Sequence, residues 1–303
     1  MKTLLIGATG FLGSHVAARL AERDLAVFVR PTSDRSCLPP HVETRVGDLD
    51  NLASIARALE RVDALIYCAS MGFGHVPPLV QMLKAAGVRR AVFISSTAIF
   101  TTLPTRSRAA RLEAERAVQE SSLAWTILRP TMVYGGARDR NISRLLRFLR
   151  WAPVYPLFGD GRALHQPIYV EDLAGAVVAA LDSPSTIGRT YNVAGAAPLS
   201  YADLVRTARR AIGREVRLVP VPLGLALAAA RITSALRVPA PLTPEQVLRL
   251  AEDKAFDCTE AVRDFGFRTR TFAECVALEA VALGLAGEKL GSQGDCEPLL
   301  HPQ

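Results

Sequence analysis

The sequence has no apolar run long enough to cross a bilayer, which takes about 20 consecutive apolar residues. The nearest candidate, residues 222–230, is too short. Half of the 303 residues are hydrophobic, so the chain has ample material for a folded core. The first apolar run begins at Thr3, which leaves no room for a signal peptide. We therefore expect a cytoplasmic protein without a membrane partner.

Lysine is scarce, and the net charge of +7 comes almost entirely from arginine. The arginines are scattered singly or in pairs, and no block of them alternates with aromatic residues as a nucleic-acid surface would. We expect no nucleic-acid partner. We expect the positive charge to favour the binding of an anionic cofactor or substrate. The lysines are Lys2, Lys84, Lys254 and Lys289.

Cysteine is also rare, and the five cysteines lack the spacing of a metal site. Their odd number fits a reducing compartment better than a disulfide framework. We expect no bound metal, and no internal repeat is visible in the sequence. The cysteines are Cys37, Cys68, Cys258, Cys275 and Cys296.

The opening stretch carries the strongest signal. The apolar run 3–6 predicts a buried parallel strand, glycines punctuate the following turn, and a helix is expected from Phe11. A strand that enters a helix through glycines brings a diphosphate against bare backbone, where N–H groups and the positive helix end hold its charge. The sequence therefore predicts a dinucleotide site at Gly7, Thr9, Gly10, Phe11, Leu12 and Gly13.

Strands and helices alternate from residue 1 to about residue 135, which predicts a doubly wound parallel sheet, the Rossmann arrangement of α/β proteins. Residues 136–285 are expected to form a smaller, mainly helical substrate lobe that returns strands to the sheet from 165–195. A helix is expected over 223–238, and Ser200 is expected to cap another helix. The tail, 286–303, is expected to be disordered.

The end of the second strand bears on the choice of cofactor. NAD sites usually carry an acid here for the adenosine ribose, whereas an arginine suits a 2′-phosphate. Arg30, Ser33 and Arg35 supply guanidinium and hydroxyl groups, although Asp34 lies among them. NADP is therefore favoured over NAD. Alternatively, Arg30 stacks on the adenine without discriminating between the two.

Three motifs together resemble the extended and atypical branches of the short-chain dehydrogenase/reductase superfamily, which are NAD-dependent epimerase/dehydratase-like proteins. They are the glycine turn, Leu-Arg-Pro-Thr-Met-Val-Tyr-Gly at 128–135 and Tyr-Val-Glu-Asp-Leu-Ala at 169–174. The resemblance covers roughly residues 1–275. It implies cofactor contacts at Asp48, Leu49, Cys68, Ala69, Ser70, Arg111, Pro130 and Val133.

Some of these residues have competing interpretations. Asp48 or Asp50 is equally suited to cap the helix that begins near Leu52. Cys68 fits a small buried residue better than a nucleophile, because no partner is evident in the sequence.

The Tyr-x-x-x-Lys pair that the family uses for proton transfer is absent, because none of the six tyrosines is followed by lysine four residues later. The resemblance places Ser107 at the tyrosine position, Arg111 at the lysine position, and Thr97 as the residue that holds a substrate oxygen. Arg111 can still bind the ribose, but serine is a poor acid and arginine stays protonated. Another residue, water or the substrate then supplies the proton, or the site binds nucleotide without turnover.

The resemblance and the residue types suggest substrate contacts at His75, Tyr134, Arg162 and His165. His165 is the proposed replacement acid, because histidine titrates near neutral pH. Tyr134 is either structural or a proton donor. Asp172 is expected to cap a helix rather than to act in catalysis.

The sequence thus predicts an NAD(P)-dependent oxidoreductase or an epimerase/dehydratase-like enzyme with a non-standard catalytic site. Its substrate is expected to be a small carbonyl, enone or sugar-type molecule, and a homodimer is compatible with the sequence. The alternative is a non-catalytic NAD(P)-binding sensor or scaffold.

Overall fold

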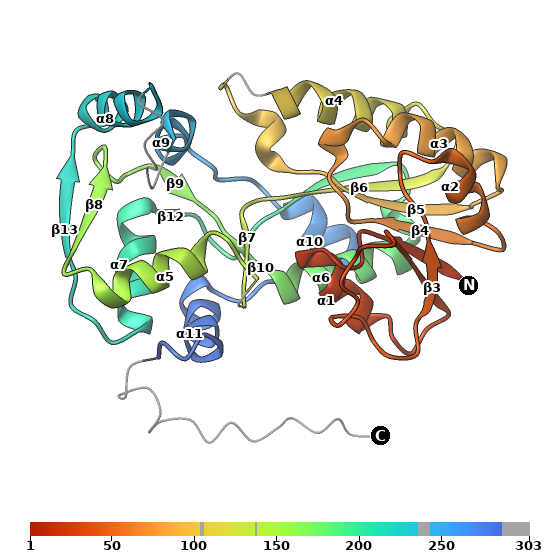
Figure 1. The fold of residues 1–303 in the computed structure, drawn as a ribbon, viewed down its shortest axis with the longest axis horizontal. Helices are drawn as coiled ribbons and strands as arrows, with labels where there is room; N and C mark the ends of the chain where they lie inside the picture. Colours follow the sequence, from red (N-terminus) through yellow and green to blue (C-terminus); the bar gives the residue numbers. More distant parts are fainter. Residues whose placement is uncertain (104–105, 137, 236–242, 287–303) are drawn as a thin grey trace.

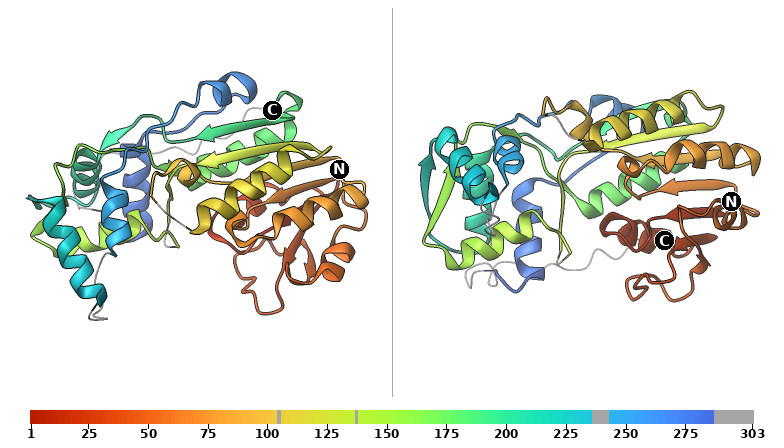
Figure 2. Two further views of the ribbon diagram at one scale, coloured as in Figure 1. Left: turned by 90° about the horizontal axis from the view of Figure 1, so that it is seen from above. Right: turned by 45° about the horizontal axis from the view of Figure 1, so that its top comes forward.

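The computed structural model describes residues 1–103, 106–136, 138–235 and 243–286. The expected tail therefore lies, from residue 287 onward, outside the described residues, as does the end of the helix predicted over 223–238. The described chain forms two lobes that lie side by side (Figure 1). The views in Figure 2 show the same division from above and from an oblique angle.

The larger lobe is built on a seven-stranded sheet in the order β11-β6-β5-β4-β1-β2-β3. Every neighbouring pair of strands is parallel. The central strands are buried throughout, and apart from Thr3 and Arg90 their residues are hydrophobic, as is typical of strands covered on both faces. The strands are β1 (Thr3–Ile6), β2 (Leu25–Val29), β3 (Glu43–Val46), β4 (Ala64–Tyr67), β5 (Arg90–Ile94), β6 (Ala124–Pro130) and β11 (Arg189–Val193).

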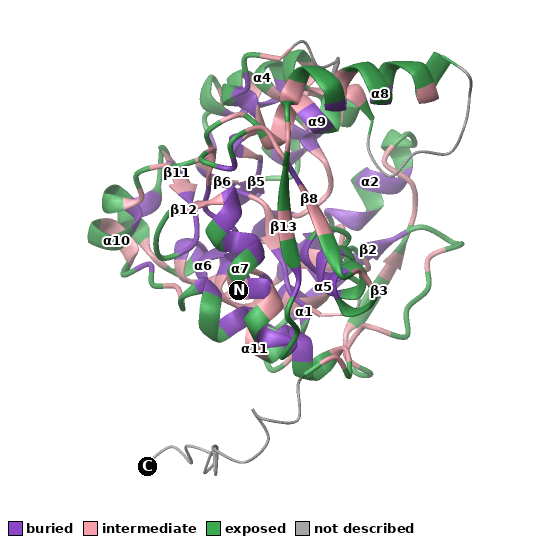
Figure 3. Cartoon of the chain, turned by 90° about the vertical axis from the view of Figure 1, so that its left-hand side faces the viewer, coloured by how far each residue is buried: buried purple, intermediate pink, exposed green. Residues whose placement is uncertain are grey.

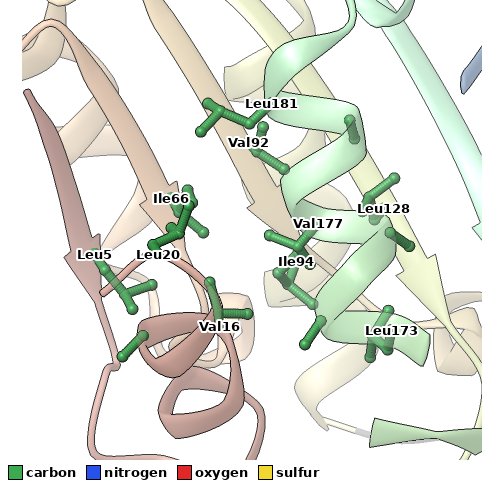
Figure 4. Packing of buried hydrophobic residues seen from close by; sticks show 14 of the residues in the cluster. Leu5, Val16, Leu20, Ile66, Val92, Ile94, Leu128, Leu173, Val177 and Leu181 are labelled. Carbon is green, nitrogen blue, oxygen red and sulfur yellow. The ribbon is translucent and has the colours of Figure 1, made fainter. Parts of the chain in front are cut away.

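Successive side chains of a strand point to opposite faces of the sheet, so these buried strands give the sheet two apolar faces. Helices cover both of them. Leu5 packs with α1 (Phe11–Arg19) and α6 (Val170–Asp182) on one face. Figure 4 shows side chains of these two helices packed over the strands. Leu4 packs on the other face, beneath a second group of helices. These are α2 (Leu52–Ala58), α3 (Val76–Ala85) and α4 (Arg106–Gln119).

The predicted doubly wound fold is confirmed, and its strand order locates the binding crevice. The chain runs from β1 to β2 and β3 on one side and then returns to β4 on the other side of β1. Ligands of such sheets bind where the strand order reverses, at the carboxyl ends of the strands. The ends of β1 and β4 therefore mark the candidate site.

The smaller lobe has a helical core and three short sheets. Two-stranded pairs join β7 (Val133–Tyr134) with β10 (Ile168–Tyr169), and β9 (Leu164–His165) with β12 (Leu199–Ser200). A third, parallel pair joins β8 (Val154–Phe158) with β13 (Arg217–Val221). The helices are α5 (Ile142–Trp151), α7 (Tyr201–Ala211), α8 (Leu223–Ala235), α9 (Pro244–Leu250) and α11 (Phe272–Ala282).

The chain crosses between the lobes more than once. Helix α6 packs against α1, and α10 (Thr259–Phe265) packs against β11. Both helices thus belong with the parallel sheet, although they follow residue 135. Three short 3-10 helices complete the described elements: η1 (Met71–Phe73), η2 (Thr97–Phe100) and η3 (Pro184–Thr186).

Two helix caps differ from the sequence prediction. Asn51, not Asp48 or Asp50, caps α2, since its side chain accepts a hydrogen bond from the Ser54 amide. Tyr169, not Asp172, is the N-cap residue of α6. Ser200 caps α7 as predicted, because its hydroxyl accepts from the Asp203 amide.

The outer side of the smaller lobe is formed partly by α8, most of which is exposed in Figure 3. In the part of the chain that the structure describes, no helix is both long and apolar enough to cross a bilayer.

Candidate functional site

The glycine turn joins β1 to α1 by close backbone contacts. Gly7 has a φ of +85°, a conformation that favours glycine, and its carbonyl accepts a 2.9 Å hydrogen bond from the Gly10 amide. A Cβ on Gly13 would lie 2.0 Å from the Gly7 oxygen. The first turn of α1 is therefore held directly against the end of β1.

The same turn fits the diphosphate of a dinucleotide. Gly10 is exposed, it is the N-cap of α1, and the first turn of the helix has no acidic residue. Thr9, Phe11 and Leu12 are partly exposed beside it. Backbone N–H groups and the positive end of the helix dipole thus face a place where negative charge is stabilised.

The ends of β1 and β4 approach each other closely. A Cβ on Gly7 would lie 2.7 Å from the Ala69 amide nitrogen, so only glycine allows this approach. Cys68 and Ser70 flank Ala69, and the Ser70 hydroxyl accepts a hydrogen bond from the Gly72 amide at 3.3 Å. Burial raises the pKa of the Cys68 thiol to about 12, which excludes a thiolate nucleophile at neutral pH.

Polar groups follow β2, where the adenosine ribose is expected. Arg30 and Arg35 are exposed and Ser33 is partly exposed. The Asp34 carboxylate accepts from the Ser36 amide at 2.9 Å and from the Ser36 hydroxyl at 3.0 Å. These bonds lower the pKa of Asp34, and they engage both of its oxygens.

Asp48, Leu49 and His75 lie at the neighbouring loops. The Asp48 carboxylate accepts from the Asp50 amide at 3.0 Å, and Leu49 packs on the cluster beneath α2 and α3. His75 Nε2 lies 3.0 Å from a carboxylate oxygen of Asp50. The His75 side chain thus points toward the β3–α2 loop and is engaged by Asp50, rather than being free to contact a substrate.

Ser107 and Arg111 form a pair next to the loop that follows β4. The Arg111 guanidinium donates to the Ser107 hydroxyl at 2.7 Å. A Cβ on Gly72 would lie 3.4 Å from Ser107 Cβ and 3.6 Å from Arg111 Cζ. Burial lowers the pKa of Arg111, and the charge of Arg249 adds to this effect. The pair therefore faces the carboxyl edge of the sheet.

Thr97 lies where β5 and β6 end together. Its hydroxyl donates to the Pro130 carbonyl at 3.2 Å, and Val133 follows in β7. Ser95, two residues before Thr97, is buried, and its hydroxyl has no hydrogen-bond partner among the described residues. Sequence reasoning did not single out Ser95, because a serine at a strand end is common.

Tyr134 and Arg162 lie away from this edge. Tyr134 is 1% exposed and packs between Tyr169 and Phe272, at ring distances of 5.5 and 5.4 Å. It belongs to the core of the smaller lobe, which corrects its prediction as a substrate contact. The Arg162 side chain is 89% exposed, and its guanidinium lies 3.9 Å from Asp160, so the described contacts do not bring it to Thr97.

His165 is poorly suited to donate a proton. It is 5% exposed, and its Nε2 lies 3.2 Å from the Leu250 carbonyl oxygen. Burial, and then the charge of Lys254, lower its pKa to about 4. The ring is therefore neutral at pH 7, which argues against the predicted role of replacement acid.

Residues 251–256, which sequence reasoning missed, connect the smaller lobe to the loop after β5. Glu252 accepts from the Thr101 hydroxyl at 2.8 Å and from the Thr102 amide at 2.9 Å. Lys254 donates to the Arg249 carbonyl, and burial lowers its pKa to about 8. No sequence pattern brings residue 252 near residue 101, so only the fold reveals this contact.

Two further observations concern other places on the molecule where a ligand or a metal ion could bind. An open groove of about 460 Å³, lined by Lys2, Glu43 and Arg45 among others, lies along the edge strand β3 and α2, and none of the glycines of the turn after β1 lines it. Within the described ranges, no group of three or more His, Cys, Asp or Glu residues could hold a metal ion.

Comparison with known proteins identifies the family. A family described as NAD(P)H-binding matches residues 7–184, more than half of the chain. Subunit 9 of the mitochondrial NADH dehydrogenase (ubiquinone) 1 alpha subcomplex of Arabidopsis thaliana is 28% identical over 288 residues, covering 86% of this chain and 70% of the relative. The NAD(P)H azoreductase of Xenophilus azovorans is 29% identical over 303 residues, covering 93% and 99%.

Solved structures share the fold. The UDP-glucose 4-epimerase of Thermus thermophilus in complex with NAD superposes with a TM-score of 0.73 at 21% identity, covering 94% of this chain and 99% of that one. The chain therefore belongs to the NAD(P)H-binding family, and its relatives are epimerase/dehydratase-like members of the extended short-chain dehydrogenase/reductases, as its motifs predict.

Proposed function

We propose that this protein is an NADP-dependent oxidoreductase or epimerase/dehydratase-like enzyme that acts on a small carbonyl, enone or sugar-type substrate without a tyrosine acid. The observation that carries the proposal is the Ser107–Arg111 pair, hydrogen-bonded at 2.7 Å. It lies beside Gly72 of the loop after β4, and Ala69, at the start of that loop, lies against Gly7 of the glycine turn. The chain therefore keeps its cofactor site but lacks the tyrosine that would transfer the proton.

The bound cofactor supplies hydride chemistry, and the residues of this chain position the reactants. Arg111 donates to the nicotinamide ribose, with Ser107 fixing its guanidinium. The Thr97 hydroxyl orients a substrate oxygen by leaving the Pro130 carbonyl, to which it now donates. These are positioning roles, which hold reacting atoms at about 3 to 3.5 Å.

The proton comes from a group other than Ser107 or His165. Ser107 has too high a pKa, and His165 is neutral with its pKa lowered to about 4. Lys254 has a pKa lowered to about 8, which suits proton exchange near neutral pH. Water or the substrate itself remains the competing source.

The preference for NADP rests on Asp34. Its two oxygens are engaged by Ser36 rather than presented to a ribose hydroxyl. Arg30 and Arg35 are exposed on either side and suit the charge of a 2′-phosphate.

Fluorescence titration with NADPH and NADH tests the proposal. We expect micromolar binding of NADPH, weaker binding of NADH, and turnover with at least one member of an aldehyde, enone and sugar-nucleotide panel. Arg111→Met should weaken binding of both cofactors roughly ten-fold through loss of the ribose contact. Failure of the native chain to bind either cofactor would overturn the proposal.

The second candidate is a non-catalytic NAD(P)-binding protein. The missing tyrosine and the Thr97 hydroxyl committed to a backbone carbonyl favour it, and one relative is named as a subunit of a larger complex. This candidate predicts cofactor binding without turnover on the whole panel. Turnover that disappears in Thr97→Val while cofactor binding persists would exclude it.

A further inference from the structure

The described part of the loop between β7 and α5 contains two glycines with a restricted backbone. Gly135 and Gly136 both have positive φ angles, of 128° and 82°, and a Cβ on Gly135 would lie 2.6 Å from the Tyr169 ring. The Asp139 carboxylate accepts from the amide of Asn141, the N-cap residue of α5, at 2.8 Å and from the Ser143 amide at 2.7 Å. Arg138 therefore lies between a restricted turn and the hydrogen-bonded start of α5.

The Arg138 side chain reaches back across the lobes to the glycine turn. Its Nη2 donates a 2.6 Å hydrogen bond to the Thr9 carbonyl, although 129 residues separate the two in the sequence. Arg138 also contributes, after the two Ser36 contacts, to the lowered pKa of the Asp34 carboxyl. The guanidinium thus lies between the turn that receives the diphosphate and the residues that follow β2.

We propose that Arg138 is a cofactor-binding residue that pairs with the diphosphate of the bound dinucleotide. The inference deepens the proposed function and rests on its cofactor site. The bond to Thr9 uses one of the five N–H donors of the guanidinium, and it is the single hydrogen bond found for this group among the described residues. The remaining donors match the geometry of phosphate oxygens, and their bonds to an anion are stronger than a bond to a neutral carbonyl.

Pairing with Arg138 adds a full positive charge, which the strand–turn–helix unit does not supply. Thr9 and Gly10 offer backbone N–H groups and a helix dipole but no full positive charge. Arg138 directly precedes Asp139, which is hydrogen-bonded to the first turn of α5, so a bond to the diphosphate also connects the smaller lobe to the cofactor. The affinity for the dinucleotide therefore depends on a residue outside the sequence motif that marks the site.

Isothermal titration of the full chain with NADPH, NADH, ADP and adenosine tests the assignment. Arg138→Gln should weaken binding of the three diphosphate-containing probes roughly ten-fold or more, because a charge-assisted hydrogen bond is lost. Adenosine binding should not change. Arg138→Lys should recover part of the loss, since lysine keeps the charge but not the fork.

The control is Arg140→Gln, which removes the same charge from an exposed residue of the same loop and should change binding by no more than about two-fold. Thermal melts confirm that each variant is folded. Native affinity in Arg138→Gln, an equal loss in the Arg140 variant, or a loss confined to NADPH would overturn the inference. A native chain that binds none of the probes would instead contradict the proposed function itself.

Discussion

Arg90 is a buried arginine whose described partners are all neutral oxygens. It is 8% exposed, and its guanidinium donates to the Ala124 carbonyl at 2.7 Å and the Ala180 carbonyl at 2.6 Å. The hydroxyls of Thr126 and Thr186 accept further bonds. Burial lowers its pKa to about 10, so it remains charged at pH 7, where the negative end of α6 stabilises it.

We predict that Arg90→Met lowers the free energy of unfolding by about 2–4 kcal/mol, because several buried carbonyls and hydroxyls lose their donor. Urea denaturation measures the change. Arg89→Met is the matched control, since Arg89 is 81% exposed and pairs with Asp63, and it should cost less than about 1 kcal/mol. Equal losses in the two variants would contradict the structural role of Arg90.

The choice between NADP and NAD is also decided by single residues. Asp34→Asn keeps an acceptor for Ser36 but removes a negative charge close to the expected 2′-phosphate. We predict that NADPH binds a few-fold more tightly to this variant while NADH binding stays the same, as measured by fluorescence titration. A matching gain for NADH would show that Asp34 does not face the 2′ position.

The sequence predicts residues whose role depends on local backbone, and misses those whose role depends on tertiary contacts. Gly7 and Gly13 follow from spacing alone, because the turn needs a positive φ at Gly7 and a Cβ on Gly13 would meet the Gly7 oxygen. Arg138 and Glu252 gain their roles from residues far along the chain. Histidine is a common proton donor, but burial and then the charge of Lys254 lower the pKa of His165, and neither is visible in the sequence.

At the scale of elements, the apolar runs predict the strands closely because buried parallel strands need continuous apolar sequence. Helix caps are harder to assign, since several acids compete for each helix start. Asp48 accepts from the Asp50 amide, which leaves the cap to Asn51. Asp172 binds the Arg270 amide at 2.9 Å, a contact from another element that no local pattern predicts.

The segment 251–256 joins two elements of different lobes, and Glu252 makes its main contact. We predict that Glu252→Gln speeds amide hydrogen exchange at residues 99–103, because charge-assisted bonds to Thr101 and Thr102 become weaker neutral ones. Glu245→Gln serves as the control, because Glu245 pairs with Arg249 on the exposed side of α9. Unchanged exchange in Glu252→Gln would mean that other contacts hold the loop.

At the scale of the whole molecule, the doubly wound sheet and the return of the chain to it from 165–195 were predicted from the sequence, but the position of the helix in this returning segment was not. Residues 170–193 return to the sheet through α6 and β11. The reason is packing, since α6 buries Leu173 and Val177 against the face that α1 also covers. A helix with this pattern would fit either lobe, so sequence alone does not choose.

A buried acid in the smaller lobe couples the stability of the molecule to pH. Glu279 is fully buried, and neither carboxyl oxygen has a hydrogen-bond partner among the described residues. Burial raises its pKa to about 8, the Asp139 carboxylate adds to the rise, and Arg147 opposes it. The folded state thus keeps a proton that the unfolded chain releases above its ordinary pKa of 4.5.

The stabilisation from this proton is complete below pH 4.5 and is lost as the pH rises through about 8. We predict that Glu279→Gln melts at a higher temperature than the native chain at pH 9, by a few degrees, and shows little gain at pH 5. Thermal melts across this range measure the difference between the two chains. Parallel curves would show that Glu279 does not titrate between the two states.

The central claim is that the turn after β1 holds the diphosphate of a nicotinamide dinucleotide although the sequence lacks a Tyr-x-x-x-Lys pair. A crystal structure of the protein grown with NADPH tests it most directly. The account predicts a diphosphate against the amides of Gly10 to Leu12, with the nicotinamide ribose beside Arg111. A dinucleotide bound anywhere else on the chain, or crystals without density at the turn despite saturating NADPH, would contradict it.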